Sequence, residues 1–411
     1  MSEQQAAVDN RIPVNIITGF LGSGKTTLLN HWVNSEKFKD TLVLINEFGD
    51  VGLDHELVQA VDDTVVLLGS GCICCTLQGE LVNSLAINLA KSKQGAIPKF
   101  DRVLIETTGL ADPAGVISTL INDEFCLDNY YYAGTVTVVD GQFAREQLQK
   151  QYEAVKQVAL ADIILISKGD LIDADELDSI REVVHGINPA APIHAVVKGN
   201  ITPDVMEEIG PYQTTTQKEE ISTTEKRLDN WLSIKPVMAP AKSGITLASP
   251  LRPVTTSIEA GVAKPKIIAH TNIDSFAITR DEPINPMVFL SAVNVVQQQY
   301  GDSLLRIKGI LDVEGQDRPV IIHGVQGQFY PITQLDAWPQ GKKESKIVMI
   351  CRATVLEQIK HMFLDALANP DEAALDYYRQ LLEAAEIASD SMSEDDGVEE
   401  IVLYDRSKED K

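Results

Sequence analysis

Short apolar runs alternate with helix-length stretches along the first half of the chain. The runs are rich in β-branched residues and apolar at successive positions, so each would be buried on both faces. Strands of this kind, covered by helices on both sides, form a mostly parallel, doubly wound α/β sheet, which we expect over residues 1–210. The predicted strands are residues 14–18, 41–46, 64–68, 102–106, 135–139, 163–167 and 193–197.

The pattern changes twice after this first domain. Residues 211–270 are rich in Thr, Ser, Pro and Lys without any periodicity, which predicts a linker or insertion. Residues 271–370 predict a smaller α+β domain. Its expected strands are residues 273–279, 304–312, 319–325, 328–332 and 346–351, and its expected helices are residues 286–300 and a segment from Thr354.

The last residues, 371–411, predict an amphipathic helix followed by an acidic tail. Leu375, Tyr378 and Leu382 would share one face of this helix. The tail is dominated by Asp and Glu, and we expect it to be disordered.

Composition and charge limit the partners of the chain. Its 411 residues, of which 44% are hydrophobic, suffice for two cores. The 60 acidic and 35 basic residues give a net charge of -25, which would repel the backbone of a nucleic acid and an anionic membrane surface. The polar first residues carry no secretory signal, and no stretch reaches the roughly 18 apolar residues of a membrane span. We therefore expect a cytoplasmic protein that binds neither nucleic acid nor membranes.

A phosphate-binding motif follows the first predicted strand. Residues 19–26 read G-x-x-x-x-G-K-T and precede a predicted helix, which is the context that a P-loop requires. The glycines Gly19, Gly22 and Gly24 let backbone N–H groups converge on phosphate. Lys25 would reach the β and γ oxygens of the nucleotide, and the Thr26 hydroxyl would bind Mg²⁺.

The fourth predicted strand ends in Glu106, within the sequence Glu-Thr-Thr-Gly of residues 106–109. An acid in this place lies at the carboxyl edge of a parallel sheet, where α/β proteins bind their ligands. We expect Glu106 to bind Mg²⁺ or a water molecule of its coordination shell, and the amide of Gly109 to contact the γ-phosphate.

The strand at residues 163–167 leads into Ser167, Lys168 and Asp170, which match the guanine motif [NTS]-K-x-D. A carboxylate at Asp170 accepts two hydrogen bonds from guanine, which adenine does not offer, and the stem of Lys168 can lie along the purine face. The motif therefore favours GTP over ATP. A surface turn of the same sequence is the alternative interpretation.

Three cysteines, Cys72, Cys74 and Cys75, follow the third predicted strand and precede a helix that is expected to begin near Gly79. Thiolates at this spacing can hold one soft ion such as Zn²⁺ or Co²⁺ and leave one coordination position open, as metal transfer requires. Glu47 or Asp50 could occupy or border that position. Buried thiols without a ligand and a redox pair are the alternatives.

The motifs occur in the order seen in CobW-type P-loop GTPases, and the chain resembles the zinc-metallochaperone branch of that family, in the SIMIBI class. The resemblance rests on T-G-F-L-G-S-G-K-T-T, N-E-F-G-D-V-G-L-D, G-C-I-C-C, E-T-T-G-L-A-D-P and S-K-G-D, and on L-L-R-I-K-G and I-H-G-V-Q of a CobW C-terminal domain. It implies GTP hydrolysis coupled to passing zinc, or cobalt in some members, to a client metalloprotein.

The resemblance also implies roles for single residues. Gly22, Ser23, Gly24, Lys25, Thr26 and Thr27 would cradle phosphate; Glu47 and Glu106 would lie near Mg²⁺; Cys72, Cys74 and Cys75 would bind zinc; and Ser167, Lys168 and Asp170 would recognise guanine. We expect Lys25, Thr26, Glu47 and Glu106 to serve hydrolysis. The seven histidines are scattered, so a metal store is not expected.

Residues 46–54 lie between the P-loop helix and the cysteines, and we expect them to act as a switch that couples nucleotide state to metal affinity. Intrinsic hydrolysis should be slow until a client or a second copy of the chain completes the site, so a homodimer is possible. Four alternatives stay open: a nucleotide-gated metal sensor, cobalt delivery linked to cobalamin synthesis, a small-molecule kinase or ATPase, and a thiol–disulfide enzyme.

Overall fold

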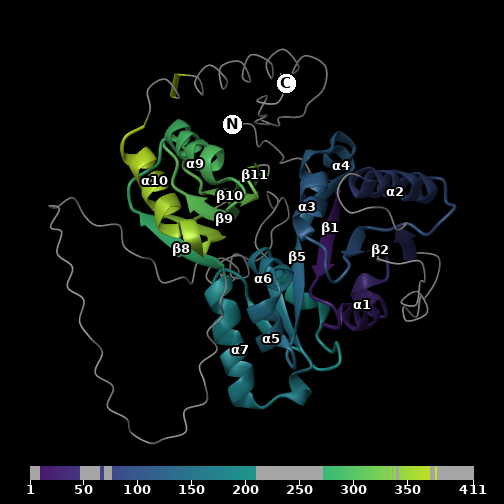
Figure 1. The fold of residues 1–411 in the computed structure, drawn as a ribbon. Coiled ribbons are helices and arrows are strands. Elements are labelled where there is room, and N and C mark those ends of the chain that lie inside the picture. The colour runs from purple at the N-terminus through teal and green to yellow at the C-terminus, as the bar shows by residue number, and fades with distance from the viewer. Residues whose placement is uncertain are drawn as a thin grey trace, which may run out of the picture.

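The computed structural model describes residues 10–46, 65–68, 76–209, 272–330, 332–335, 337–338, 342–370 and 375–376. Within these ranges the chain forms two sheets, one in each half (Figure 1). The predicted linker, residues 47–54 of the expected switch, the cysteine motif, most of the predicted C-terminal amphipathic helix and the whole acidic tail lie outside the described residues.

The first sheet is parallel throughout, in the order β3-β2-β4-β1-β5-β6-β7. β1 is fully buried at Val14, Ile16 and Ile17, because it lies between β4 and β5 and both faces of the sheet are covered. The strands are β1 (Ile12–Thr18), β2 (Thr41–Asn46), β3 (Val65–Leu68), β4 (Arg102–Glu106), β5 (Tyr130–Asp140), β6 (Ile163–Ser167) and β7 (Ile193–Ala195).

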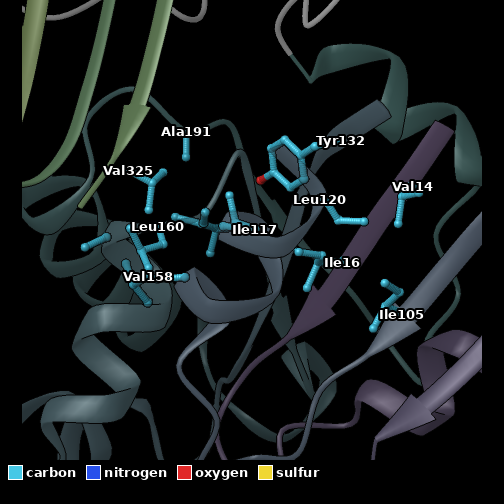
Figure 2. Packing of buried hydrophobic residues seen from close by; sticks show 14 of the residues in the cluster. Val14, Ile16, Ile105, Ile117, Leu120, Tyr132, Val158, Leu160, Ala191 and Val325 are labelled. Atoms are coloured by element: carbon cyan, nitrogen blue, oxygen red, sulfur yellow. The ribbon is translucent and has the colours of Figure 1, made fainter. Parts of the chain in front are cut away.

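Each face of this sheet has its own core. On one face the strands pack against α2 (Thr76–Lys93), α3 (Pro113–Asn122), α6 (Tyr152–Ala159) and α7 (Ala174–Ile187), and Figure 2 shows Ile117 and Leu120 of α3 beside Ile16 of β1. On the other face α1 (Lys25–Val33) buries Leu28, Leu29 and Trp32. The two remaining helices of the described domain are α4 (Glu124–Asn129) and α5 (Ala144–Lys150). The chain is therefore a doubly wound α/β domain in this half, as the sequence predicts.

The second sheet is antiparallel, in the order β11-β10-β9-β13-β8, with β12 paired to β10. Its strands are β8 (Ile273–Arg280), β9 (Leu304–Leu311), β10 (Val320–Val325), β11 (Gln328–Phe329), β12 (Thr333–Gln334) and β13 (Ser345–Arg352). The helices α9 (Pro286–Tyr300) and α10 (Leu356–Ala368) pack together against one of its faces, where Phe289 meets Phe363 edge to face. This is the smaller α+β domain that the sequence predicts.

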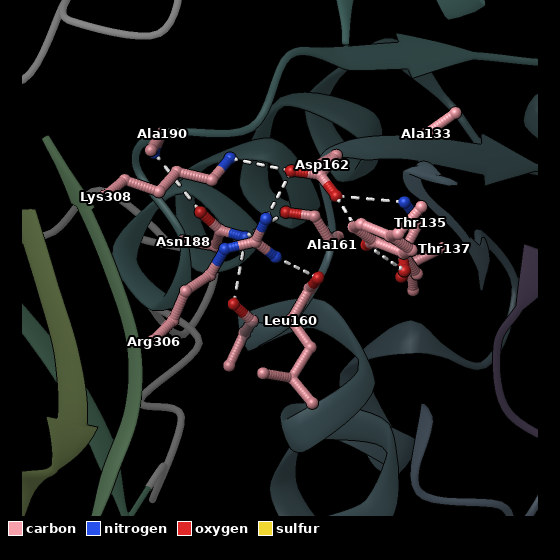
Figure 3. A network of polar contacts seen from close by, with 12 residues as sticks. Ala133, Thr135, Thr137, Leu160, Ala161, Asp162, Asn188, Ala190, Arg306 and Lys308 are labelled. Atoms are coloured by element: carbon pink, nitrogen blue, oxygen red, sulfur yellow. Dashed lines mark hydrogen bonds and ion pairs between the residues drawn. The ribbon is translucent and has the colours of Figure 1, made fainter. Parts of the chain in front are cut away.

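The second sheet also contacts the first domain. Val325 of β10 belongs to the same apolar cluster as Val158 of α6 and the adjoining Leu160 (Figure 2). Beside it, Arg306 and Lys308 of β9 reach Asp162, which precedes β6 (Figure 3). The two halves thus share both an apolar cluster and a buried ion-pair network.

A bulge in β5 shapes this network. Val14 pairs with Tyr132 and Ile16 pairs with Thr135, so two residues of β5 lie opposite one residue of β1. A bulge re-aims the side chains of the strand that carries it. Here the Tyr132 hydroxyl and the Thr135 N–H both donate to Asp162 Oδ2, each at 2.9 Å.

Most predicted strand and helix bounds agree with the structure within two residues, and three elements differ more. The fifth strand begins at Tyr130, before the predicted residue 135, because the chain continues as a strand through the bulge. The helix after the cysteines begins at Thr76, earlier than the predicted Gly79. Of the predicted strand 328–332 only Gln328–Phe329 is a strand, β11; Tyr330 after it is buried against Tyr132, and β12 follows the predicted range at Thr333–Gln334.

Candidate nucleotide site

The P-loop lies between β1 and α1, at the carboxyl edge of the first sheet. Gly19, Gly22 and Gly24 have φ values of 143°, 71° and 94°, which favour glycine. At Gly19 a Cβ atom would lie 2.2 Å from the carbonyl oxygen of Val138, so only glycine lets this turn pass the backbone of β5. The loop is therefore fixed by its neighbour strand as well as by its own turns.

Lys25 folds back over the loop that precedes it. Its Nζ donates to the carbonyl oxygens of Gly19, at 3.0 Å, and Phe20, at 3.3 Å, and the residue is buried. The ammonium group is thus held at the loop where the sequence predicts phosphate. Its contact with β and γ oxygens stays a prediction.

Thr26 and Glu106 meet across the gap between α1 and β4. The Thr26 hydroxyl donates to Glu106 Oε1 at 2.9 Å, and Glu106 is only 6% exposed. A hydroxyl and a carboxylate oxygen are the hard ligands that Mg²⁺ prefers, so the two residues fit the predicted ion by their chemistry and by their separation. The structure thus brings together two residues that lie 80 positions apart in the chain.

Gly109 touches the P-loop directly. A Cβ atom at this position would lie 2.6 Å from the backbone nitrogen of Leu21. Two residues earlier, Thr107 Oγ1 donates to Thr18 Oγ1 at 2.8 Å. The segment after β4 is therefore pressed against the P-loop, where the sequence predicts that Gly109 contacts phosphate.

The α6 helix also forms hydrogen bonds to the segment after β4. Gln157 is buried and donates to the carbonyl oxygens of Gly109, at 3.2 Å, and Ala111, at 3.0 Å. Lys156 forms an ion pair with Asp112, which also caps α3 by accepting from Ala114 N at 3.1 Å. Sequence reasoning missed these α6 residues, because the chain gives no local sign that a glutamine will be buried.

Ser167 joins the predicted guanine motif to the P-loop. Its hydroxyl donates to the carbonyl oxygen of Ser23 at 2.6 Å, and the residue is buried. The side chain thus faces the phosphate loop, and a serine at this position fixes the loop after β6 to the loop after β1. The predicted contact of Ser167 with guanine stays a prediction.

Lys168 and Asp170 follow at the edge of the sheet. Lys168 has a φ of 55°, and its Nζ donates to Asp140 Oδ2 at 2.7 Å. Asp170 lies in the short turn Gly169–Leu171 and is exposed. Asp140 was missed by sequence reasoning, although an acid at the end of an apolar strand is the signal that identified Glu106.

The chain after β7 closes this edge of the sheet. Val196 N donates to Ile166 O at 2.7 Å, and Gly169 N donates to Val196 O at 3.2 Å. A Cβ atom on Gly199 would lie 2.9 Å from the carbonyl oxygen of Thr27, so this loop also contacts α1. Sequence reasoning assigned no role to residues 196–199, which border both predicted nucleotide motifs.

The predicted zinc ligands and Glu47 lie outside the described residues, so Cys72, Cys74 and Cys75 stay a prediction. Within the described ranges there is no group of three or more His, Cys, Asp or Glu side chains placed to hold a metal ion. The other two cysteines, Cys126 and Cys351, are buried, and burial raises the pKa of each thiol to about 12. These two thiols are therefore protonated and unreactive at neutral pH.

Among the helices of the described residues, none is long and apolar enough to cross a bilayer.

Two family models match the chain. The model of the CobW/HypB/UreG nucleotide-binding domain matches residues 13–195, and that of the cobalamin synthesis protein cobW C-terminal domain matches residues 273–367. The first covers the parallel sheet with its P-loop, and the second covers the antiparallel sheet with α9 and most of α10.

Several proteins of known name are similar to this chain in sequence. The zinc chaperone YjiA of Escherichia coli (strain K12) is 29% identical over 354 residues, which are 86% of this chain and 98% of the relative. The zinc-regulated GTPase metalloprotein activator 1 of Schizosaccharomyces pombe is 32% identical over 197 residues, 46% of this chain and 47% of the relative. The crystal structure of Zn(II)-bound YjiA GTPase from E. coli is 26% identical with a TM-score of 0.55, covering 87% of this chain and 99% of that one.

Proposed function

Since the chain belongs to the family that joins a CobW/HypB/UreG nucleotide-binding domain to a CobW C-terminal domain, we propose that it is a GTP-hydrolysing zinc metallochaperone. The main support for the proposal is that the P-loop, the segment after β4 and the loop after β6 contact one another at one edge of the sheet. Thr26 contacts Glu106, Gly109 packs on the P-loop, and Ser167 is bonded to Ser23. The names of relatives as zinc chaperones and GTPases support the choice of nucleotide and metal.

The residues of the P-loop bind and orient the phosphates. Backbone N–H groups of residues 19–26 and the Lys25 ammonium offset the charge of the β and γ phosphates. Thr26 and Glu106 would hold Mg²⁺, which neutralises charge as the γ-phosphate leaves. Gly109 can approach the phosphates closely because it already contacts the P-loop at Leu21.

Recognition of the base falls to the loop after β6. Asp170 is exposed at the edge of the sheet, where its carboxylate can accept from the guanine N1–H and the 2-amino group. The hydrogen bond from Ser167 to the Ser23 carbonyl sets the distance from this carboxylate to the phosphate loop. A nucleotide that offers no donors to Asp170, such as ATP, should bind more weakly.

Zinc is the cargo in this proposal, and Cys72, Cys74 and Cys75 are its predicted ligands. Three thiolates leave a coordination position that a client metalloprotein can fill while it takes the metal. The switch at residues 46–54 would couple zinc affinity to the nucleotide state, because it lies between the P-loop helix and the cysteines in the chain.

Phosphate release from GTP and from ATP tests the proposal, measured with and without zinc and an apo-form zinc enzyme as candidate client. We expect GTP to be the preferred substrate and its hydrolysis to rise when zinc and the client are both present. The Lys25→Ala variant should abolish hydrolysis, while Cys74→Ala should abolish only the response to zinc. A preference for ATP, or GTP hydrolysis that does not change when zinc and the client are added, would contradict the proposal.

A further inference from the structure

A buried carboxylate, Asp140, lies at the end of β5 beside the proposed guanine site. Only 1% of its surface is exposed, and both of its oxygen atoms accept hydrogen bonds. Oδ1 accepts from the backbone N–H of Gln142 at 2.9 Å and of Phe143 at 3.4 Å. Oδ2 accepts from Lys168 Nζ at 2.7 Å. One side chain thus supports its own turn and also holds a residue 28 positions later.

The Lys168 ammonium is fixed from two sides. It lies 2.7 Å from Asp140 Oδ2 and 5.8 Å from the centre of the Phe143 ring, within the range of a cation–π contact. Phe143 itself is 47% exposed, and its backbone is held by the Asp140 turn. The carboxylate therefore places both the ammonium and the ring that lies beneath it.

Positioning matters here because a lysine stem has many rotamers. Ordering such a side chain costs conformational entropy, and ligand binding would have to offset this cost if the stem were free. The backbone of Lys168 is also in the left-handed region, at a φ of 55°, and its side chain is about one third exposed. A salt bridge with a fully buried carboxylate orders the stem before any ligand arrives.

We propose that Asp140 is a positioning residue for guanine nucleotides, which fixes Lys168 so that its stem forms a preorganised surface for the purine ring, with Phe143 at the border of that surface. The inference rests on the proposed GTP-binding function and adds two residues to it. Asp170 selects guanine through hydrogen bonds, whereas Asp140 acts through Lys168 and strengthens binding of the base as a whole.

Asp140→Asn separates this role from turn formation. The carboxamide oxygen of asparagine can still accept from Gln142 and Phe143, but its NH₂ group cannot accept from the Lys168 ammonium. Lys168→Met removes the same salt bridge from its other end and keeps an apolar stem. The exposed pair Glu146 and Lys150 on α5, 2.9 Å apart, gives a matched control cycle.

The test is a double-mutant cycle on GDP affinity, measured by calorimetry on the full chain. We expect Asp140→Asn to weaken GDP binding by about 5- to 50-fold, in line with couplings between contacting residues. In a Lys168→Met background the same change should have almost no effect on GDP affinity. The thermal midpoint of Asp140→Asn without nucleotide should stay near that of the wild type, because the Lys168 ammonium that it leaves is partly exposed. Glu146→Gln with Lys150→Met should leave GDP affinity unchanged.

Two results would overturn the inference: wild-type GDP affinity in Asp140→Asn, or an equal loss with and without Lys168. If Asp140→Asn does not fold, the two lysine variants still test the inference. Lys168→Met should bind GDP more weakly than the wild type, whereas Lys150→Met should not. Equal GDP affinities of these two variants would also overturn the inference. A wild-type protein that prefers ADP to GDP would instead refute the proposed function. The two failures are therefore distinguishable.

Discussion

Gly109 lacks a side chain, and this lets the segment after β4 pack directly against the P-loop of the proposed nucleotide site. Its Cα lies so close to the P-loop that a Cβ would be 2.6 Å from the Leu21 nitrogen. This nitrogen is backbone, so the clash cannot be relieved by rotating a side chain. The position therefore fixes the P-loop and the segment after β4 against each other.

We predict that Gly109→Ala weakens GTP binding by at least about tenfold, since a displacement near 1 Å in a binding loop can cost this much or more. Gly115→Ala is the matched control, because this glycine lies in the α3 helix and a Cβ there would meet nothing within 4 Å. The control should bind GTP normally and gain about 0.5–1 kcal/mol of stability. Equal GTP affinities in the two variants would refute the role of Gly109.

The α6 helix is one of the elements of the first domain that contact the second. Gln157 holds the carbonyl oxygens of Gly109 and Ala111, and one turn later the Leu160 carbonyl accepts from Arg306 of β9. Asn188 also donates to carbonyl oxygens at this end of the helix, including Val158 O at 2.8 Å. A helix of eight residues therefore contacts the segment beside the P-loop and the second sheet.

We predict that Gln157→Leu lowers the free energy of unfolding by about 1–3 kcal/mol, because two carbonyl oxygens lose their donor. Hydrogen exchange of the segment after β4 should increase as well. Gln149→Leu on the exposed side of α5 is the control and should change neither quantity. Unchanged exchange of residues 107–112 in Gln157→Leu would show that α6 does not restrain them.

Most strands could be predicted from the sequence, because apolar runs such as residues 102–106 and 163–167 are buried on both faces and end at the same edge. The bulge of β5 could not, since Tyr132 and Thr135 point to one carboxylate only when β1 is paired beside them. In the site, the sequence identified Thr26 and Glu106 and carried the same signal for Asp140, but the partners of Asp140 and Gln157 lie far along the chain and could not be predicted. The cysteines, Glu47 and the tail stay predictions.

At the scale of the whole molecule, one buried carboxylate forms ion pairs with two cationic side chains between the domains. Asp162 is fully buried and pairs with Arg306 and Lys308, which are themselves at most 3% exposed (Figure 3). Tyr132 and Thr135 complete its hydrogen bonds. Buried ion pairs add little net stability but fix geometry, and here only the loss of the shared carboxylate would leave buried cations without a counter-charge.

We predict that Arg306→Met destabilises the protein by at least about 2 kcal/mol, because the buried Leu160 carbonyl and Asp162 each lose a donor while Lys308 still pairs with Asp162. Lys342→Met, which breaks an exposed pair with Glu344, should cost less than about 1 kcal/mol. Denaturant midpoints of the two variants provide the measurement. Similar midpoints would show that the network contributes no more than a surface pair.

Lys308 gives the interface a dependence on pH. Burial, followed by repulsion from Arg306, lowers the pKa of Lys308 from 10.5 to about 8. Between these values the unfolded chain keeps a proton that the folded chain has released, so this residue makes stability rise with pH. The stability of the wild type relative to Lys308→Met should therefore be constant below pH 8 and increase towards pH 10.5.

The comparison with Lys308→Met isolates this residue from other groups. Burial raises the pKa values of Cys126 and Cys351 to about 12, which lowers stability as pH rises above 9.0, but these thiols are present in both proteins. Urea unfolding at a series of pH values gives the difference. A difference that falls between pH 8 and 10.5 would contradict the assigned shift.

If nucleotide state controls zinc handling, the zinc affinity of the protein must differ between its GTP-bound and GDP-bound states. The full chain is loaded with a non-hydrolysable GTP analogue or with GDP, and zinc is titrated against a competing chelator. We predict affinities that differ by at least about fivefold, the lower range of allosteric coupling, and loss of tight binding in Cys74→Ala. Identical zinc affinities in the two states would contradict the account.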